Sequence, residues 1–236
     1  MSLDIQALTF DVFGTVVDWR TAVIREGQAL RGEVDWPAFA DRWRGLYRPT
    51  INAVIAGERP WASFDELQRW MLEQVLPEFG LTDLTEAEQA ELSTVWRRLD
   101  PWPDAAAGLA RMKEHLVVCA LSNGSVWQLI QLARFGGLPW DAVFSVELFR
   151  AYKPDPRVYR GAADLLQLPP EQVMMVAAHV YDLRAARANG MKTAFVARPL
   201  EWGSEGAAEV PEDNEFDLVA TDFLDLASQL ERNRLS

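Results

Sequence analysis

The stretch Ala7-Leu8-Thr9-Phe10-Asp11-Val12-Phe13-Gly14-Thr15-Val16-Val17-Asp18 decides the fold of this chain. An apolar run rich in strand-forming residues ends abruptly at Asp11, and a Gly-Thr turn follows. In an open parallel sheet, ligands bind just outside the carboxyl ends of the strands. A strand that ends at Asp11 would present its carboxylate to such a ligand, so we interpret Asp11 as a nucleophile.

The composition is that of a globular protein with a packed core. The chain has 236 residues, of which 49% are hydrophobic and 25% are charged, and its length suits one α/β domain with a smaller insert. The net charge of -12 argues against nucleic acid or an anionic membrane as a partner. The single cysteine, Cys119, lies in an apolar run, which predicts a buried, inert thiol and fits a reducing cytoplasm. We expect no signal peptide, because the N-terminus lacks a basic n-region and an apolar h-region, and no membrane span, because no run approaches about 20 apolar residues.

The first part of the chain changes from strand to helix. Residues 4–10 predict a strand, and the pattern from 18 to 99 is helical. An apolar face that ends at Tyr47 predicts a helix that Pro49 bends or ends. Two capping boxes, starting at Ser63 and Thr85, predict further helix starts.

From residue 100 onward, strands and helices alternate. This alternation predicts a doubly wound parallel sheet, with a Rossmann-like core of residues 1–17 and 100–236 and a helical cap of residues 18–99 inserted after the first strand. Residues 198–216 are expected to form a polar, acidic loop. The expected strands are 116–121, 142–146, 172–177, 192–197 and a short one near 217–220; the expected helices are 104–115, 126–136, 156–167, 182–189 and 222–232.

Four polar motifs fall where predicted strands end, at residues 11–15, 122–125, 152–156 and 177–182. Because the carboxyl ends of parallel strands meet at one edge of a sheet, the motifs predict a single site. Its chemistry is consistent: a carboxylate nucleophile, a cation to keep it ionised, a second carboxylate, and short hydroxyl donors. These groups are, in that order, Asp11, Lys153, Asp182, and the pair Ser122 and Thr15.

The succession of these motifs resembles the haloacid dehalogenase superfamily over nearly the whole chain. Most of its members are magnesium-dependent phosphatases, with patterns that resemble Asp-x-Asp at the first motif and Gly-Asp-x-x-x-Asp at the fourth. Here Phe13 stands two residues after Asp11, and Ala178 stands four residues before Asp182. A general acid and a magnesium carboxylate are therefore missing. A magnesium-dependent small-molecule phosphatase is the weaker alternative, and we expect no metal or other cofactor.

The same departures favour the L-2-haloacid dehalogenase branch, because a halide leaves without being protonated. That branch has motifs that resemble Asp-x-Tyr-Gly-Thr, Ser-Asn-Gly and Tyr-Lys-Pro-Asp-x-Arg-Val-Tyr. Residues 122–124 and 152–159 match closely, and Phe13 replaces the first tyrosine. The resemblance implies metal-independent hydrolysis of short (S)-2-haloacids to (R)-2-hydroxy acids, through an ester on Asp11, in a homodimer.

The resemblance also implies a role for each matching residue. Lys153 would pair with Asp11, and Ser122 with nearby backbone N–H groups would bind the substrate carboxylate. Asp182 would orient or activate water. Arg44, which follows a tryptophan, would receive the halide, with Arg42 and Arg48 as alternatives. The supporting residues and the remaining candidates for substrate or halide binding are Thr15, Asn123, Phe13, Tyr159 and Tyr181.

The fourth motif departs most from the branch. The branch pattern Ser-Ser-Asn-x-Trp-Asp is replaced by residues 177–182, Ala-Ala-His-Val-Tyr-Asp. His179 could hold the hydrolytic water, share base duty with Asp182, or narrow the halide pocket. A third hypothesis, a non-catalytic binder of small carboxylates, is disfavoured because Asp11, Lys153 and Asp182 are all present. The halide preference, including fluoride, stays open.

Overall fold

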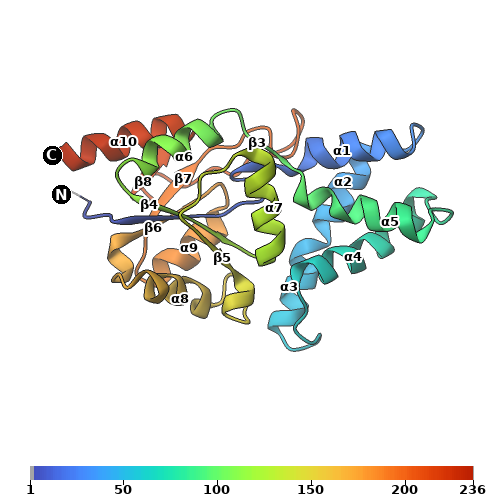
Figure 1. Cartoon of the computed structure of the whole chain (residues 1–236), viewed down its shortest axis with the longest axis horizontal. Helices are drawn as coiled ribbons and strands as arrows, with labels where there is room; N and C mark the ends of the chain where they lie inside the picture. The colour runs from blue at the N-terminus through green and yellow to red at the C-terminus, as the bar shows by residue number, and fades with distance from the viewer. Residues whose placement is uncertain (1–2, 236) are drawn as a thin grey trace.

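The central sheet has six parallel strands and places β1 in the middle. The protein is represented by a computed structural model that describes residues 3–235 (Figure 1). The strand order is β5-β4-β1-β6-β7-β8, which confirms the predicted doubly wound parallel sheet. After β1 the chain adds β4 and then β5 on one side of it. It then returns to the other side of β1 and adds β6, β7 and β8, so the direction of strand addition switches between β1 and β6. The strands are β1 (Ala7–Phe10), β4 (Val117–Ser122), β5 (Ala142–Ser145), β6 (Val173–Ala177), β7 (Lys192–Val196) and β8 (Leu218–Ala220).

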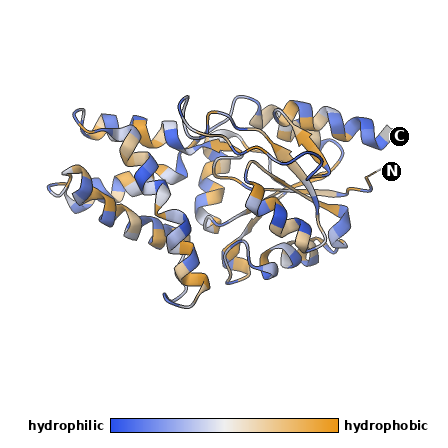
Figure 2. Ribbon diagram, turned by 180° about the vertical axis from the view of Figure 1, so that it is seen from behind, coloured by the Kyte–Doolittle hydropathy of each residue, from blue (hydrophilic) through white to orange (hydrophobic). Residues whose placement is uncertain are grey.

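Helices cover both faces of this sheet. Helices α6 and α10 pack against each other on one face, and α8 and α9 lie on the other (Figure 1). Figure 2 shows apolar strands between helices that are apolar on one side and polar on the other. Such two-sided helices bury their apolar faces on the sheet. The helices are α6 (Ala105–Lys113), α7 (Val126–Gly136), α8 (Pro156–Leu166), α9 (Val180–Ala188) and α10 (Phe223–Leu235); short 3-10 turns η3 and η4 cover Val146–Leu148 and Pro170–Gln172.

A helical segment lies beyond the carboxyl end of the sheet (Figure 1). Two short strands bracket it, β2 (Val17–Asp18) and β3 (Asp100–Pro101), which pair antiparallel. The segment buries several tryptophans, among them Trp19, Trp36 and Trp43, in edge-to-face aromatic contacts. Its elements are α1 (Trp19–Leu30), α2 (Trp36–Gly45), α3 (Tyr47–Ile55), α4 (Phe64–Val75), η1 (Leu76–Phe79), α5 (Glu86–Ser93) and η2 (Thr94–Arg97).

Several local predictions are confirmed, and several boundaries are wrong. Strand β1 begins at Ala7 rather than residue 4, α6 ends at Lys113 rather than residue 115, and α10 ends at Leu235 rather than residue 232. Both capping boxes form, at Ser63 and Thr85. The helical pattern breaks at Leu46 rather than at Pro49, because Pro49 occupies the first turn of α3, where no backbone N–H is needed. Helix α9 begins at Val180, two residues earlier than expected.

The thiol of Cys119 is fully buried, and burial raises its pKa to about 12, as expected for an inert cysteine. Within residues 3–235, no helix is both long and apolar enough to span a membrane.

Candidate active site

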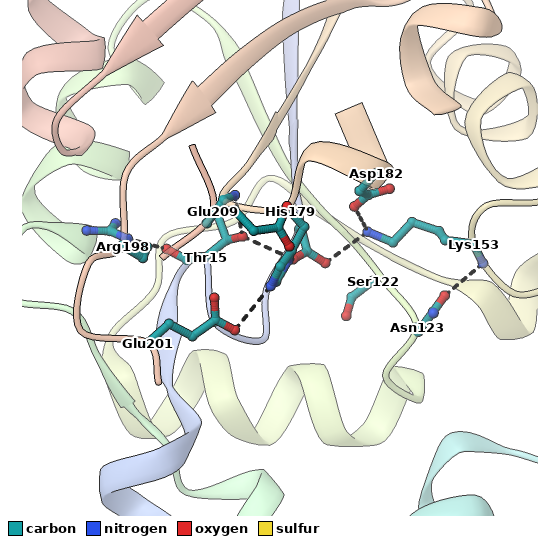
Figure 3. Close-up of polar contacts among 12 residues, drawn as sticks. Thr15, Ser122, Asn123, Lys153, His179, Asp182, Arg198, Glu201 and Glu209 are labelled. Atoms are coloured by element: carbon teal, nitrogen blue, oxygen red, sulfur yellow. Dashed lines mark hydrogen bonds and ion pairs between the residues drawn. The ribbon is translucent and has the colours of Figure 1, made fainter. Parts of the chain in front are cut away.

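Asp11 lies at the switch point of the sheet, directly after β1. Its backbone N–H donates to the carbonyl of Val176 at 3.0 Å, which continues the ladder to β6 by one residue. The side chain of Asp11 is 9% exposed, and its carboxylate has three polar neighbours. Lys153 Nζ donates to Oδ1 at 2.9 Å, while Thr15 Oγ1 donates to Oδ2 at 3.0 Å and His179 Nδ1 lies 2.9 Å from Oδ2 (Figure 3).

This environment keeps Asp11 ionised. Burial alone would raise the pKa of the carboxyl, but the charge of Lys153 and the hydrogen bond and charge of His179 outweigh it. The pKa of Asp11 is therefore well below its usual range. An ionised carboxylate at the end of a strand is the form that a nucleophile requires.

Lys153 joins Asp11 to Asp182. Its Nζ also donates to Asp182 Oδ2 at 2.5 Å, and the two carboxylates raise the pKa of the lysine although burial opposes them. Asp182, in the first turn of α9, is fully buried, and its Oδ1 accepts from the hydroxyl of Tyr159 at 2.5 Å. Burial and the nearby charge of Asp11 raise the pKa of Asp182 against the opposing effect of Lys153. Both oxygens of Asp182 thus bind protein groups.

The motif after β4 connects the sheet to the helical segment. Asn123 Oδ1 accepts the backbone N–H of Lys153 at 2.9 Å, and its Nδ2 donates to the hydroxyl of Tyr47 in α3 at 2.6 Å. Ser122 is fully buried, and its Oγ accepts the backbone N–H of Gly124 at 3.2 Å. Asn123 therefore holds both the backbone of the active-site lysine and the helical segment.

His179 lies between two carboxylates. It is the N-cap residue of α9, and its Nε2 lies 3.1 Å from Glu201 Oε1 (Figure 3). Glu201 in turn accepts from Trp19 Nε1 at 3.1 Å. Burial would lower the pKa of His179, but Glu201 and Asp11 raise it well above its usual range. The same imidazole lowers the pKa of Glu201, again against burial.

Glu201 is a residue that the sequence reasoning missed, because it lies in the loop expected to be merely polar and acidic. No local sequence pattern marks Glu201; in the structure it lies against Gly14, whose φ of 89° suits glycine. A Cβ on Gly14 would lie 2.1 Å from Glu201 Oε1, so glycine allows this close approach. The buried Arg198 was also missed; its Nε donates to the carbonyl of Thr15 at 2.7 Å and thereby supports the loop that follows Asp11.

A pocket of about 270 Å³ opens beside His179. Arg44 and Arg48 both line it, with guanidinium groups 4.3 Å and 3.8 Å from the ring centres of Tyr47 and Tyr181. The Nε atom of Arg44 is buried and has no hydrogen-bond partner among the described residues. An unpartnered buried donor is costly, so it favours an anion in the pocket.

The third candidate arginine, Arg42, does not line this pocket; it binds Glu78 on the surface, with distances of 2.7 and 2.8 Å.

The residues around Asp11 do not fit a magnesium site of the phosphatase type. Phe13 is buried, with its ring centre 5.9 Å from that of Phe64 and 6.0 Å from that of Trp96. Ala178 offers only a methyl group. A phenyl ring and a methyl cannot supply the oxygen ligands that magnesium prefers. Across residues 3–235, no cluster of three or more histidine, cysteine, aspartate or glutamate side chains is arranged to hold a metal ion.

The fold and this site define a class of hydrolase. The family model for haloacid dehalogenase-like hydrolases matches residues 5–190. The chain belongs to this family.

Comparison with individual proteins identifies the branch as well. The chain is 31% identical to (S)-2-haloacid dehalogenase 1 of Pseudomonas sp. (strain CBS-3), over 82% of this chain and 85% of that one. It is 48% identical to the L-2-haloacid dehalogenase PA0810, with a TM-score of 0.91 and coverage of 96% and 99%. For the defluorinating L-2-haloacid dehalogenase Rha0230 the identity is 40%, the TM-score 0.93 and the coverage 98% of both chains. The L-2-haloacid dehalogenase from Xanthobacter autotrophicus with chloropropionic acid covalently bound is 27% identical to this chain, with a TM-score of 0.80. The match covers 96% of this chain and 98% of that one. The chain therefore lies in the L-2-haloacid dehalogenase branch of the superfamily.

Proposed function

We propose that the protein hydrolyses short-chain (S)-2-haloacids to (R)-2-hydroxy acids and halide, without a metal ion, through an ester on Asp11. The observation that carries the proposal is the ionised carboxylate of Asp11 with the cation of Lys153 on one oxygen and the phenyl ring of Phe13 two residues on. Carbon–halogen cleavage needs the nucleophile and no general acid. The covalent adduct in the Xanthobacter autotrophicus relative supports the same chemistry here.

In the first step an oxygen of Asp11 attacks C2 of the substrate in line with the halogen. A C–O bond forms, the C2–halogen bond breaks, and the halide leaves with the bonding pair. Inversion at C2 follows from the in-line geometry. In the second step water adds to Cγ of Asp11, the ester Cγ–O bond breaks, and the hydroxy acid leaves.

The halide would leave towards Arg44, whose buried Nε lacks a protein partner. Ser122 and nearby backbone N–H groups would hold the substrate carboxylate. Fluoride is a candidate leaving group, since a relative with 40% identity is a defluorinating enzyme.

The test is halide release in the presence of a chelator. We expect release from (S)-2-chloropropionate and chloroacetate but not from (R)-2-chloropropionate, and loss of release in Asp11→Asn. Asp213→Asn, an exposed carboxylate in a distant part of the chain, is the matched control and should keep activity. A single turnover in ¹⁸O-labelled water should place the label in Asp11. Absence of halide from every short haloacid would refute the proposal, and magnesium-stimulated phosphate release would support the alternative instead.

Three further parts of the proposal concern the whole molecule. The helical segment 18–99 would act as a cap over the site. The hydrogen bond that Asn123 donates to the hydroxyl of Tyr47 supports this role, because it joins the segment to the sheet.

The buried, reduced Cys119 supports a reducing, cytoplasmic location. A homodimer follows from the branch resemblance, and light scattering after gel filtration tests it.

A further inference from the structure

The pocket side of Asp11 carries a second polar chain that the roles above leave unused. Asp11 Oδ2, His179 and Glu201 follow one another at 2.9 and 3.1 Å, all nearly buried. A nucleophile, a base in contact with it and a carboxylate that orients the base form the arrangement of a catalytic triad.

We propose that His179 is the general base that activates water against the Asp11 ester, and that Glu201 is the residue that positions it. This inference rests on the proposed function. A general base must lie within hydrogen-bond reach of the water it deprotonates. His179 lines the pocket, and its Nδ1 lies 2.9 Å from Oδ2 of Asp11, so the imidazole stands between the pocket and the carboxyl group. A water that reaches Cγ of the ester past this ring comes within hydrogen-bond reach of Nδ1.

Asp182 is less suited to this task. It is fully buried, and its two oxygens accept from Lys153 and Tyr159. His179, in contrast, lines the pocket through which water and halide pass. Asp182 therefore serves to hold Lys153.

The charges around His179 change during the reaction. In the free enzyme the ring faces the carboxylates of Asp11 and Glu201, which favour the imidazolium. Formation of the ester removes the charge of Asp11, so the imidazolium releases a proton to solvent. Glu201 then remains in contact with the ring, and the ring of Tyr181 lies beside it. The other charged and titratable groups that line the same pocket as His179 are Arg44, Arg48, Tyr47 and Glu209.

The second step then balances. Water adds to Cγ and gives one proton to His179, which restores the imidazolium beside Glu201. The tetrahedral intermediate collapses, the Cγ–O ester bond breaks, and the acid proton on Asp11 passes to the departing alkoxide. The products are the hydroxy acid, halide and the proton released earlier.

The experiment compares ester formation with ester hydrolysis for chloroacetate in the full-length enzyme. In His179→Asn and His179→Gln we expect a burst of about one halide per chain followed by turnover roughly 10²- to 10⁴-fold slower. Intact-protein mass spectrometry should find the chain carrying the carboxymethyl group. His115→Asn, the only other histidine and an exposed one, is the matched control and should keep full turnover.

Glu201→Gln tests positioning through a pH profile. Loss of its charge lowers the pKa of His179 in the ester, so the rate of ester hydrolysis should reach half its maximum at a lower pH than in the parent enzyme. Glu205→Gln, exposed in the same loop, should leave the profile unchanged.

Wild-type turnover in folded His179 variants, or a weaker halide burst with no trapped ester, would overturn the proposal, as would an unshifted profile in Glu201→Gln. If the parent enzyme releases no halide at all, the proposed function fails instead.

Discussion

Replacement of Lys153 by methionine tests the charge arrangement that holds Asp11, the proposed nucleophile. Lys153 Nζ contacts Asp11 at 2.9 Å and Asp182 at 2.5 Å, and all three side chains are nearly or fully buried. Removing the cation leaves two buried carboxylates that repel each other. Breaking a buried ion pair in this way lowers the free energy of unfolding by about 3–5 kcal/mol. For a chain of this size that loss corresponds to a decrease in Tm of about 6–20 °C.

The assay is urea unfolding at pH 7, followed by circular dichroism. Lys113→Met is the matched control, because Lys113 binds Asp141 at 2.7 Å on the surface, with both side chains about one-third exposed. The surface pair of Lys113 and Asp141 should contribute only about 0–1 kcal/mol to the free energy of unfolding, so Lys113→Met should lower it by no more than this.

A double-mutant cycle separates the charge effect from the loss of packing. In Lys153→Met with Asp182→Asn, one of the two unpaired charges is gone, and we expect about 1–3 kcal/mol of the loss to be recovered. Halide release should stay low in both variants, since Asp11 lacks its cation. A loss below about 1 kcal/mol for Lys153→Met, or no recovery in the double variant, would refute the reasoning.

Three other changes test separate parts of the site. Gly14→Ala places a methyl group where Glu201 lies and strains a backbone with φ of 89°, so we expect a loss of at least about 1 kcal/mol in urea unfolding and accumulation of ester by mass spectrometry. Arg44→Met removes a charged donor from the pocket and should lower kcat/KM for halide release roughly 10- to 150-fold, whereas Arg42→Met should leave it nearly unchanged. The pKa of Asp11 is lowered, so the carboxylate and its ion pairs persist as pH falls; the quench-flow halide burst should keep its rate down to about pH 4, where an ordinary aspartate with a pKa of about 3.9 is half protonated. A midpoint clearly above pH 4 would contradict this assignment.

The alternating part of the fold could be predicted because its signals are local. Strand runs, helix caps such as Asp155 before Pro156, and the turn at Asn189-Gly190 each depend on a few neighbouring residues. The meeting of Asp11, Lys153 and Asp182 followed from topology, since parallel strands bring their carboxyl ends to one edge.

What could not be predicted depends on distant contacts. Glu201 lies in a loop with no periodic pattern, and only the folded chain brings it to His179 and Trp19. The choice among arginines also needed coordinates, because Arg42 and Arg44 lie two residues apart on one helix and face different surroundings. The break at Leu46, in contrast, was missed for a local reason: Pro49 in a helical pattern predicts a bend or an end, whereas it occupies the first turn of α3.

The aromatic surroundings of Phe13 have a consequence for evolution within the superfamily. The ring packs against Phe64 and Trp96, and Gly124 leaves it room, since a Cβ there would lie 2.9 Å from Phe13 Cε2. A carboxylate at position 13 would enter this apolar enclosure, where desolvation is costly without new donors. A single Phe13→Asp substitution would therefore place an unpartnered carboxylate in an apolar enclosure and would still leave Ala178 without an oxygen ligand.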